Sequence, residues 1–311
     1  FLLNLYLYFF ETVITETLSS FFVKKLAIIK KFFSTPPPSR EGINKTSFFF
    51  IIFFFMVKLF NNIIYMNLVS VIIPYFKKKS FIVECVNSVI TQSYSNLEII
   101  IIYDDISHDD LNFIFKLKDL DRRISIIINS KTHGAGEARN LGISKSNGKY
   151  IAFLDADDIW DKKKIEYQIN YMKENNLNCS HTSYDIIGKD NKVLAHRTAR
   201  IFKSFEELLK SCDIGLSTVM IEKNILSEYC KFPNMKTKED FVLWLKILKS
   251  NHVIGAINIK LTYWRNSKNS LSTSTIQKLV DGFRVYYTHM NYKFFKSLYL
   301  LICLSLNYLK K

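Results

Sequence analysis

The fold is decided by residues 150–160, which read YIAFLDADDIW. An apolar run with strand character, residues 150–154, ends abruptly in a segment where three of four residues are aspartates. Strands this uniformly apolar are typical of parallel sheets covered on both faces, and in open α/β folds ligands bind at the carboxyl ends of the strands. The stretch therefore predicts a buried parallel strand that leads directly into a ligand site.

The three acids are Asp155, Asp157 and Asp158. Carboxylates this close repel one another unless a cation lies between them. Mg²⁺ and Mn²⁺ favour oxygen ligands, and they often bind one or two carboxylates together with phosphate oxygens. The acids thus predict a Mn²⁺ or Mg²⁺ cofactor. The alternative is a solvated acidic loop in which Asp158 caps the helix that follows.

Strand and helix patterns alternate from residue 66 to the acidic stretch. We expect strands at 69–73, 97–103 and 124–128 and helices at 80–92, 109–120 and 136–146. Pro74 would end the first strand, because proline cannot donate to a sheet ladder. Repeated β-α units with buried strands predict an α/β fold with a mostly parallel sheet and flanking helices. Asp104 and Asp105 follow the second strand, so they should lie at the same edge of the sheet as the acidic stretch.

The pattern after residue 161 is less regular. Helices are expected at 162–175, 205–212 and 237–250, and strands at 179–187 and 251–259. Glu239 and Asp240 stand at the start of the last of these helices, where acids interact favourably with the helix dipole. The domain predicted from all these patterns spans residues 66–285.

Composition limits the classes of partner. The chain has 311 residues and a formal net charge of +15. Such a charge suits nucleic acid, an anionic membrane or an anionic substrate, but no DNA- or RNA-binding motif is present, so we expect no nucleic acid partner. The five cysteines are scattered without a Cys-x-x-Cys pair. This excludes a recognisable zinc motif or disulfide framework and favours reduced thiols in the cytoplasm.

The first 65 residues differ from the rest. They mix aromatic-aliphatic runs with a Pro-rich loop, and residue 1 is Phe. No apolar run there reaches the ~18–20 uninterrupted residues of a spanning helix. We interpret residues 1–65 as a non-domain extension and Met66 as the natural start of the protein.

The tail, residues 286–311, is apolar and basic. Its apolar core at 299–306 is flanked by lysines and contains no acid; the lysines are Lys293, Lys296, Lys310 and Lys311. The core is too short to span a bilayer, so it suits a helix in the interface of an anionic membrane, peripheral on the inner face of the cell membrane. The alternative is a C-terminal helix packed on the domain.

Several motifs occur in a recognisable order. They are VIIPY at 71–75, QSYSNLEII at 92–100 followed by Asp104-Asp105, HG at 133–134, ARNLGI at 138–143, GKY at 148–150, the acids at 155–158, KEDF at 238–241 with LW at 243–244, and YWR at 263–265 with Ser270 and Ser272. This order resembles the family 2 glycosyltransferases of GT-A fold, of the bacterial surface-polysaccharide type, over residues 68–272. The chain departs from the family in having Ile106 where Gly is usual after the Asp pair, and Phe76-Lys77 where Asn is common.

The resemblance implies roles on the donor side. Asp157 would bind the metal directly, with Asp155 contacting the ribose or the metal through water, and Asp105 beside Asp104 would accept a hydrogen bond from uracil. Pro74 and Tyr75 would line the base pocket, Arg139 would meet the base or the carboxylates, and Arg265 with Ser270 and Ser272 would close over the diphosphate. The alternatives are turn-forming aspartates, a surface ion pair for Arg139, a proline that only ends its strand, and a polar loop for the serines.

On the acceptor side the resemblance implies that Asp240 is the general base and that Glu239 orients the acceptor. A single base with in-line attack would invert the anomeric carbon. The irregular second half would then recognise the acceptor. The structural alternative is that both acids only stabilise the start of their helix.

The function expected is inverting, metal-dependent transfer of a sugar from a nucleotide sugar, a UDP-sugar, to a glycan or lipid-linked acceptor in bacterial cell-surface polysaccharide synthesis. One alternative is a nucleotidyltransferase that makes the sugar nucleotide, but such enzymes carry a Gly-rich loop after the first strand, where this chain has Pro74-Tyr75-Phe76. The other is a catalytically inactive, membrane-associated partner in glycan assembly, for which the retained acids would have no use.

Overall fold

The structure, a computed structural model, describes residues 67–129, 134–266 and 275–309. The chain divides between Lys58 and Leu59, and the described residues belong to the unit Leu59–Lys311. The extension assigned to residues 1–65, together with His133, Ser270 and Ser272, lies outside the described residues.

The first half of this unit forms the predicted parallel sheet. Its strands are adjacent in the order β3 (Ile124–Ile128), β2 (Leu97–Tyr103), β1 (Val69–Tyr75) and β4 (Tyr150–Phe153). All three neighbouring pairs are parallel. The strand that opens the decisive stretch is therefore β4, and its carboxyl end leads into the acidic loop.

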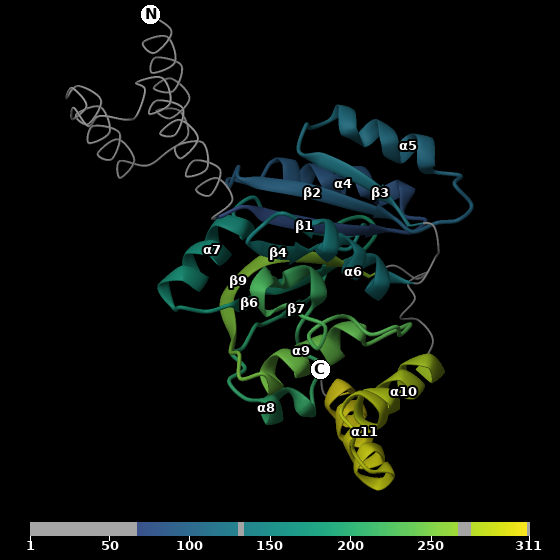
Figure 1. Cartoon of the computed structure of the whole chain (residues 1–311), viewed down its shortest axis with the longest axis vertical. Helices are drawn as coiled ribbons and strands as arrows, with labels where there is room; N and C mark the ends of the chain where they lie inside the picture. The colour runs from purple at the N-terminus through teal and green to yellow at the C-terminus, as the bar shows by residue number, and fades with distance from the viewer. Residues whose placement is uncertain (1–66, 130–133, 267–274, 310–311) are drawn as a thin grey trace, which may run out of the picture. The chain divides into compact units, whose positions relative to one another are not determined.

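Alternate residues of each strand enter two different cores. In β1, Val71 and Ile73 belong to the core with α4 (Lys79–Ile90), and Ile72 belongs to the core with α9 (Glu239–Lys249). The helices α4 and α5 (Leu111–Phe115) lie on one face of the sheet, and α6 (Ala135–Lys145) and α9 lie on the other (Figure 1). Burial on both faces explains why these strands are apolar at most positions.

Helix α6 packs very closely on β1. A Cβ added at Gly142 would come within 2.5 Å of Ile72 Cγ2, so only glycine allows this approach. This closeness brings the α6 side chains to the edge of the sheet where β4 ends.

The second half extends the sheet with mixed pairings. The described residues form a nine-stranded sheet in the order β3-β2-β1-β4-β8-β6-β9-β5, with β7 paired to β6. The added strands are β5 (Ile159–Trp160), β6 (Cys179–Ile187), β7 (Val193–Arg197), β8 (Met220–Glu222) and β9 (Ile254–Arg265). Three of these strands, β5, β7 and β8, were not predicted. The two or three residues of β5 and β8 are too few for a periodic pattern, and the side chains of β7 are exposed or half-exposed without an apolar alternation.

Two strand predictions are corrected. Pro74 lies inside β1, paired with Ile102, rather than ending the strand. The pairing of β1 with β4 stops at Ile72, so no ladder bond is lost where proline lacks its N–H. The strand expected at 251–259 is the longer β9, which includes residues 263–265.

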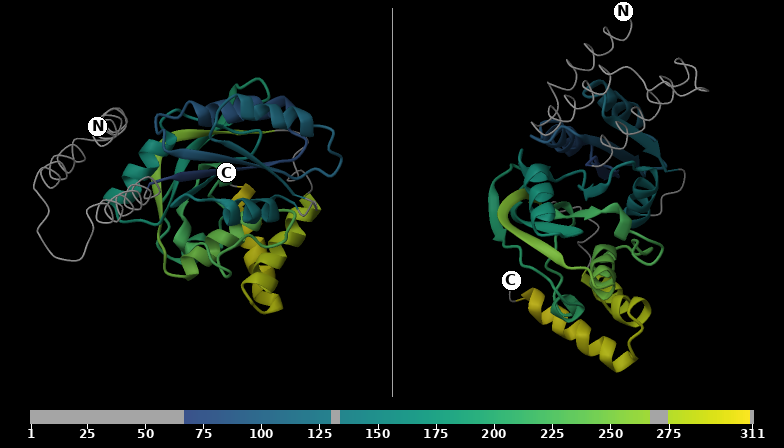
Figure 2. Two further views of the ribbon diagram at one scale, coloured as in Figure 1. Left: turned by 45° about the horizontal axis from the view of Figure 1, so that its top comes forward. Right: turned by 60° about the vertical axis from the view of Figure 1, so that its left-hand side comes forward.

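The remaining helices complete the second half. In the described ranges they are α7 (Lys164–Glu174), α8 (Phe205–Leu209), α10 (Thr275–Arg284), the π-helix η5 (Val285–His289), α11 (Phe294–Leu309), and two short turns of 3₁₀ helix, η2 (Leu216–Thr218) and η3 (Lys223–Ile225). A further short turn, η1 (Lys116–Asp119), follows α5 in the first half. Residue 286, the predicted start of the tail, falls inside η5, and the yellow helices α10 and α11 form a hairpin (Figure 2). None of the helices in the described ranges is both long enough and apolar enough to cross a membrane.

Candidate active site

The acidic loop after β4 is held on both sides by other elements. The hydroxyl of Ser217, in η2, accepts a hydrogen bond from the backbone N–H of Asp155 at 3.1 Å. The carboxylate of Asp157 accepts a 2.6 Å hydrogen bond from the Nζ of Lys78, which lies in the turn between β1 and α4. The backbone of Asp155 and the carboxylate of Asp157, the first two acids of the stretch, are thus held by different partners at the carboxyl edge of the sheet.

The carboxylate of Asp158 binds groups from other parts of the fold and does not cap a helix. Its buried carboxylate accepts hydrogen bonds from the Ser217 hydroxyl at 2.6 Å and from the backbone N–H of Arg265 at 2.8 Å. Helix α7 begins later, after Lys163, and the N–H of Ile165 in its first turn donates to Gln92 Oε1 at 3.1 Å rather than to Asp158, so the capping interpretation of Asp158 is wrong. Burial, together with the charges of Asp155 and Asp157, raises the pKa of Asp158 well above its usual value.

Arg139 joins the two acidic motifs. From helix α6 its Nη2 donates to Asp155 Oδ1 and its Nη1 donates to Glu239 Oε1, each at 2.7 Å. Its side chain is 4% exposed, so the interpretation of Arg139 as a surface ion pair is wrong. Burial alone would lower the pKa of Arg139, but the two carboxylates outweigh it and the pKa is raised. The guanidinium therefore stays charged and holds the acids that follow β4 and the acid pair of α9 together.

The acid pair at the start of α9 sits on a strained backbone. Lys238, just before it, has a left-handed conformation with φ 62°, which is unfavourable for a lysine. Burial raises the pKa of Glu239 to about 7, against the opposing effect of Arg139. Burial also raises the pKa of Asp240, whose Oδ1 accepts a hydrogen bond from the Phe241 N–H at 2.7 Å. A raised carboxyl pKa makes a stronger base near neutral pH.

The acids after β2 are buried and make local contacts. Asp104 accepts a hydrogen bond from Asn129 Nδ2 at 2.8 Å, and Asp105 accepts one from the backbone N–H of Ser107 at 3.0 Å. The second contact is the one expected of a turn-forming aspartate. Binding of a nucleobase by Asp104 or Asp105 stays a prediction.

The base-pocket prediction is corrected at residue 75. The side chain of Tyr75 is fully buried, stacks on Tyr103 with centroids 5.5 Å apart, and donates to Asp110 Oδ2 at 2.6 Å. It therefore has no free surface to offer a ligand. The next residue, Phe76, is 40% exposed at the same carboxyl end of β1. Phe76 is thus the aromatic ring beside Pro74 that a base could contact.

Arg265 lies at the end of β9 and braces the acidic loop. Its Nε donates to the Asp157 carbonyl oxygen at 2.8 Å and its Nη2 donates to Glu84 at 2.9 Å. Its Nη1 donates to Gly188, Lys189 and Asn191, and the side chain is buried. These contacts position the loop that carries Asp157, and closure of Arg265 over a diphosphate stays a prediction.

The donor set at this edge suits a hard cation. Asp155 and Asp157 offer carboxylate oxygens, and the Lys78 ammonium already places a positive charge against Asp157. Within the described ranges no three His, Cys, Asp or Glu side chains cluster as metal ligands do. The two carboxylates therefore fit Mg²⁺ or Mn²⁺ only if a substrate's phosphate oxygens complete its shell.

The structure accommodates Ile106 at the position where the family usually has glycine. Ile106 is exposed, and the left-handed position in this turn is His108, with φ 54°. A glycine is therefore not required at position 106.

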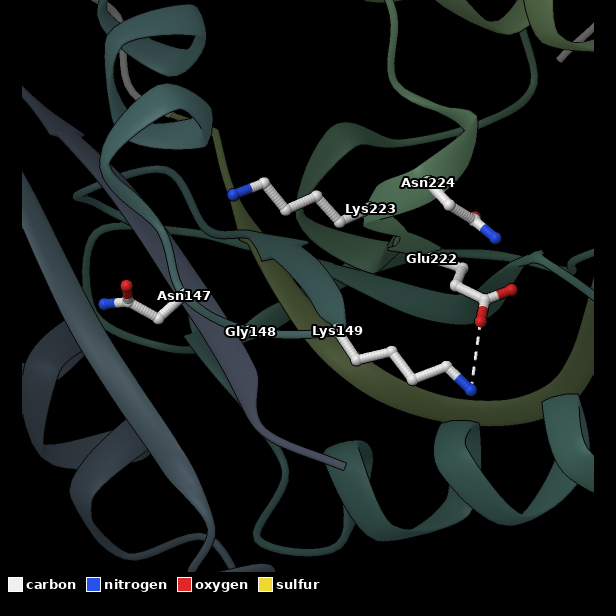
Figure 3. Close-up of a pocket in the computed structure, with 6 residues that line it drawn as sticks. All are labelled: Asn147, Gly148, Lys149, Glu222, Lys223 and Asn224. Carbon is white, nitrogen blue, oxygen red and sulfur yellow. Dashed lines mark ion pairs between the residues drawn. The ribbon is translucent and has the colours of Figure 1, made fainter. Parts of the chain in front are cut away.

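A pocket of about 450 Å³ lies elsewhere, beside the start of β4 and the end of β8 (Figure 3). It is lined by Asn147, Gly148, Lys149, Glu222, Lys223 and Asn224, and Lys149 forms a 3.0 Å ion pair with Glu222. The acids singled out in the sequence, Asp155 and Asp157, follow the opposite, carboxyl end of β4. We therefore place the candidate site at the acids and not at this pocket.

Two residues that contact the acidic loop, Lys78 and Ser217, were not predicted from the sequence. Lys78 is one of three consecutive lysines directly after β1, and a cation at the carboxyl end of a strand could have been weighed as a partner for the acids. Ser217 contacts both Asp155 and Asp158 across about sixty residues, and no local pattern marks it.

Comparison with known proteins identifies similar proteins that are described as glycosyltransferases. A profile of glycosyl transferase family 2 matches residues 70–228. The chain is 37% identical over 215 residues to an Escherichia coli UDP-Glc:α-D-GlcNAc-diphosphoundecaprenol β-1,3-glucosyltransferase, WfgD, covering 68% of this chain and 82% of that protein. It is 32% identical over 248 residues to a predicted teichuronic acid biosynthesis glycosyltransferase of Bacillus subtilis, TuaG, covering 78% and 97%.

A solved structure has the same fold. It is residues 1–349 of Staphylococcus aureus TarS in complex with UDP-GlcNAc, with a TM-score of 0.59 and 15% identity. The similarity covers 76% of this chain and 71% of that one.

Proposed function

Because the chain belongs to glycosyl transferase family 2, we propose that this glycosyltransferase moves glucose from UDP-glucose to a GlcNAc-diphosphate lipid in surface-polysaccharide synthesis, with inversion and with Mn²⁺ or Mg²⁺ as cofactor. The donor and acceptor are those in the name of the E. coli relative. The observation that carries the proposal is the Arg139 bridge, which unites the acids that follow β4 with the acid pair of α9 in one site.

On the donor side, Asp157 and Asp155 would hold the metal, and Phe76 with Asp105 would bind the uracil. The metal, when bound, neutralises the charge that develops on the departing diphosphate. Lys78 lies close enough to Asp157 to contribute a second positive charge at the same place. Arg139 keeps Asp155 oriented while these groups bind.

On the acceptor side, Asp240 takes the proton of the attacking hydroxyl. The acceptor oxygen bonds to the anomeric carbon as the bond from that carbon to the diphosphate oxygen breaks, and UDP leaves. The raised pKa of Asp240 suits it to this role. Glu239, already bound by Arg139, orients the acceptor.

A lipid-linked acceptor would bring the protein to a membrane surface, and we propose the inner face of the cell membrane. All five cysteines are free thiols, which agrees with the cytoplasm.

The test is an assay with purified protein, UDP-glucose and a GlcNAc-diphosphate lipid. We expect release of UDP, formation of the β-linked disaccharide by NMR, loss of activity with EDTA and recovery with Mn²⁺. Release of pyrophosphate from UTP and glucose 1-phosphate would instead favour the nucleotidyltransferase. Absence of turnover with a panel of UDP-sugars and acceptors would favour the inactive partner.

A further inference from the structure

The hairpin of α10, η5 and α11 packs on the domain through one face only. In α11, Leu300 and Leu304 join the core that contains α9, and Ser297 is fully buried. Tyr286, in η5, is buried and donates to the Leu209 carbonyl oxygen at 2.8 Å. This agrees with the packed-helix alternative for the tail. It also means that deleting residues 286–311 would remove part of the core.

The opposite face of both helices is apolar and exposed. Exposed large hydrophobic residues recur every three or four positions along α10 and α11, and Tyr287 in η5 lies between them; they are Ile276, Leu279, Val280, Tyr287, Phe294, Phe295, Leu298, Tyr299, Ile302, Leu306 and Tyr308. We call this set the apolar strip. Its most exposed members are Phe295, at 82%, and Ile276, at 76%. Large apolar side chains gathered at such exposure mark an interaction surface.

Aromatic contacts join the two helices at the tip of the hairpin. Phe283 stacks on Tyr287 with centroids 5.4 Å apart and meets Phe294 edge-on at 5.5 Å, and Phe294 meets Phe295 at 5.6 Å. The two rows of exposed residues are thus continuous, and the hairpin lies at one end of the domain (Figure 2).

The charges around the apolar strip have one sign. Lys278, Arg284, Lys293 and Lys296 belong to the hairpin, whose only acid between 275 and 309 is Asp281. Asp281 is fully buried and forms an ion pair with Arg284 at 3.2 Å. The exposed surface of the hairpin is therefore apolar and basic, which complements an anionic bilayer.

The hairpin is also tied to the acceptor-side acids. Asp281 Oδ2 accepts hydrogen bonds from the backbone N–H of Thr237 at 3.1 Å and from its hydroxyl at 3.0 Å. Thr237 is followed by the strained Lys238 and then by Glu239 and Asp240. A surface that fixes the hairpin would therefore fix the residues that lead into α9, the helix that carries the proposed base.

We infer that the apolar strip docks on the surface of an anionic bilayer and thereby holds Glu239 and Asp240 next to the headgroup of a lipid-linked acceptor. Docking follows from the exposure and charge of the apolar strip, and the delivery of a lipid-linked acceptor to Glu239 and Asp240 rests on the proposed function. The hairpin lies in the interface and does not span it, in line with the length of its helices. A second copy of the chain is a poorer occupant, because it would bring equal basic charges together.

The experiment is co-sedimentation of the full chain with vesicles of phosphatidylglycerol and phosphatidylcholine. Wild type is compared with Phe295→Glu/Ile302→Glu, which places two acids in the apolar strip. The matched control is Val193→Glu/Leu194→Glu on β7, where two exposed apolar residues lie outside the hairpin. We expect the partition coefficient to fall roughly tenfold or more for the strip variant and to stay near wild type for the control. Circular dichroism and thermal unfolding check that both variants fold.

Salt and lipid composition add two further readouts. Binding should weaken as salt increases and as phosphatidylglycerol is withdrawn, because the basic side chains are then screened or unpaired. Equal binding of wild type and the strip variant would overturn the inference. So would a wild-type dimer in light scattering that the strip variant dissociates, since the apolar strip would then bind a second copy.

Activity separates this inference from the proposed function. The strip variant should keep the wild-type rate with a water-soluble, short-chain GlcNAc-diphosphate acceptor and lose transfer to the same headgroup in vesicles. Vesicle binding without transfer to any acceptor would reject the proposed function and leave the docking surface in place. Equal loss with both acceptors would reject the link between docking and acceptor delivery.

Discussion

Nη1 of Arg139 lies 2.7 Å from Oε1 of Glu239, although 100 positions separate the two residues in the chain. The same guanidinium contacts Asp155 at 2.7 Å. Gly136, one turn earlier in α6, makes room for this pairing, because a Cβ there would come within 3.3 Å of Glu239 Cγ. One residue thus connects the end of β4 with the start of α9.

Arg139→Met should both destabilise the protein and abolish transfer. The substitution keeps most of the volume but leaves Glu239 buried without its cation, and breaking a buried pair in this way costs about 3–5 kcal/mol. Urea unfolding measures the loss of stability. Adding Glu239→Gln to the variant should recover part of that loss, because the remaining partner is then neutral. Strictly additive effects of the two substitutions would show that the pair is not coupled.

The Glu239 carboxyl should make stability depend on pH in a defined direction. Its pKa is about 7 in the folded protein and 4.5 for an unperturbed glutamate, so the folded state binds this proton more tightly. The stabilising contribution is complete below pH 4.5 and is lost as the pH rises to about 7.

Comparison with Glu239→Gln isolates this contribution. The free energy of unfolding of wild type minus that of Glu239→Gln should be larger at pH 5 than at pH 8. A tenfold change in an ionisation constant corresponds to ~1.4 kcal/mol, so denaturant titrations can resolve the effect. A difference that grows with pH would contradict the raised pKa.

Asp240→Asn should keep donor binding and remove transfer. An amide cannot accept the proton of the attacking hydroxyl, and removal of a general base typically lowers the rate ~10²–10⁴-fold. Glu239→Gln should lower it less. Single-turnover transfer and UDP titration separate the chemical step from binding. If Glu239→Gln were inactive and Asp240→Asn nearly active, the base would be Glu239.

Asp157→Asn and Asp158→Ala should fail in different ways. Asp157 lies against Lys78 at the candidate metal site, so its variant should fold normally, bind Mn²⁺ weakly by electron paramagnetic resonance, and lose transfer by roughly 10²-fold or more. Asp158→Ala leaves the Arg265 N–H and the Ser217 hydroxyl without their acceptor and should lower the free energy of unfolding by about 1–3 kcal/mol. Normal Mn²⁺ binding by Asp157→Asn would refute its assignment as a ligand.

The parallel half of the sheet could be predicted from the sequence alone. Strands β1 to β4 are apolar at most positions because helices cover both faces, and this leaves a strong signal in the sequence. The acids that end β2 and β4 then fall at one edge by topology. The ordered motifs identified the family and the enzyme class, and both are confirmed by the profile match and the E. coli relative.

Only the tertiary structure decided how the acids are partnered. Arg139 with Glu239, Lys78 with Asp157 and Asp158 with Arg265 are pairs of residues separated by 79 to 107 positions. Local periodicity reports which face of an element is buried, but not which distant charge meets it. For the same reason Tyr75 looked like a pocket residue and Asp158 like a cap, because burial by α4 and the approach of β9 are not encoded within a few neighbours in the chain.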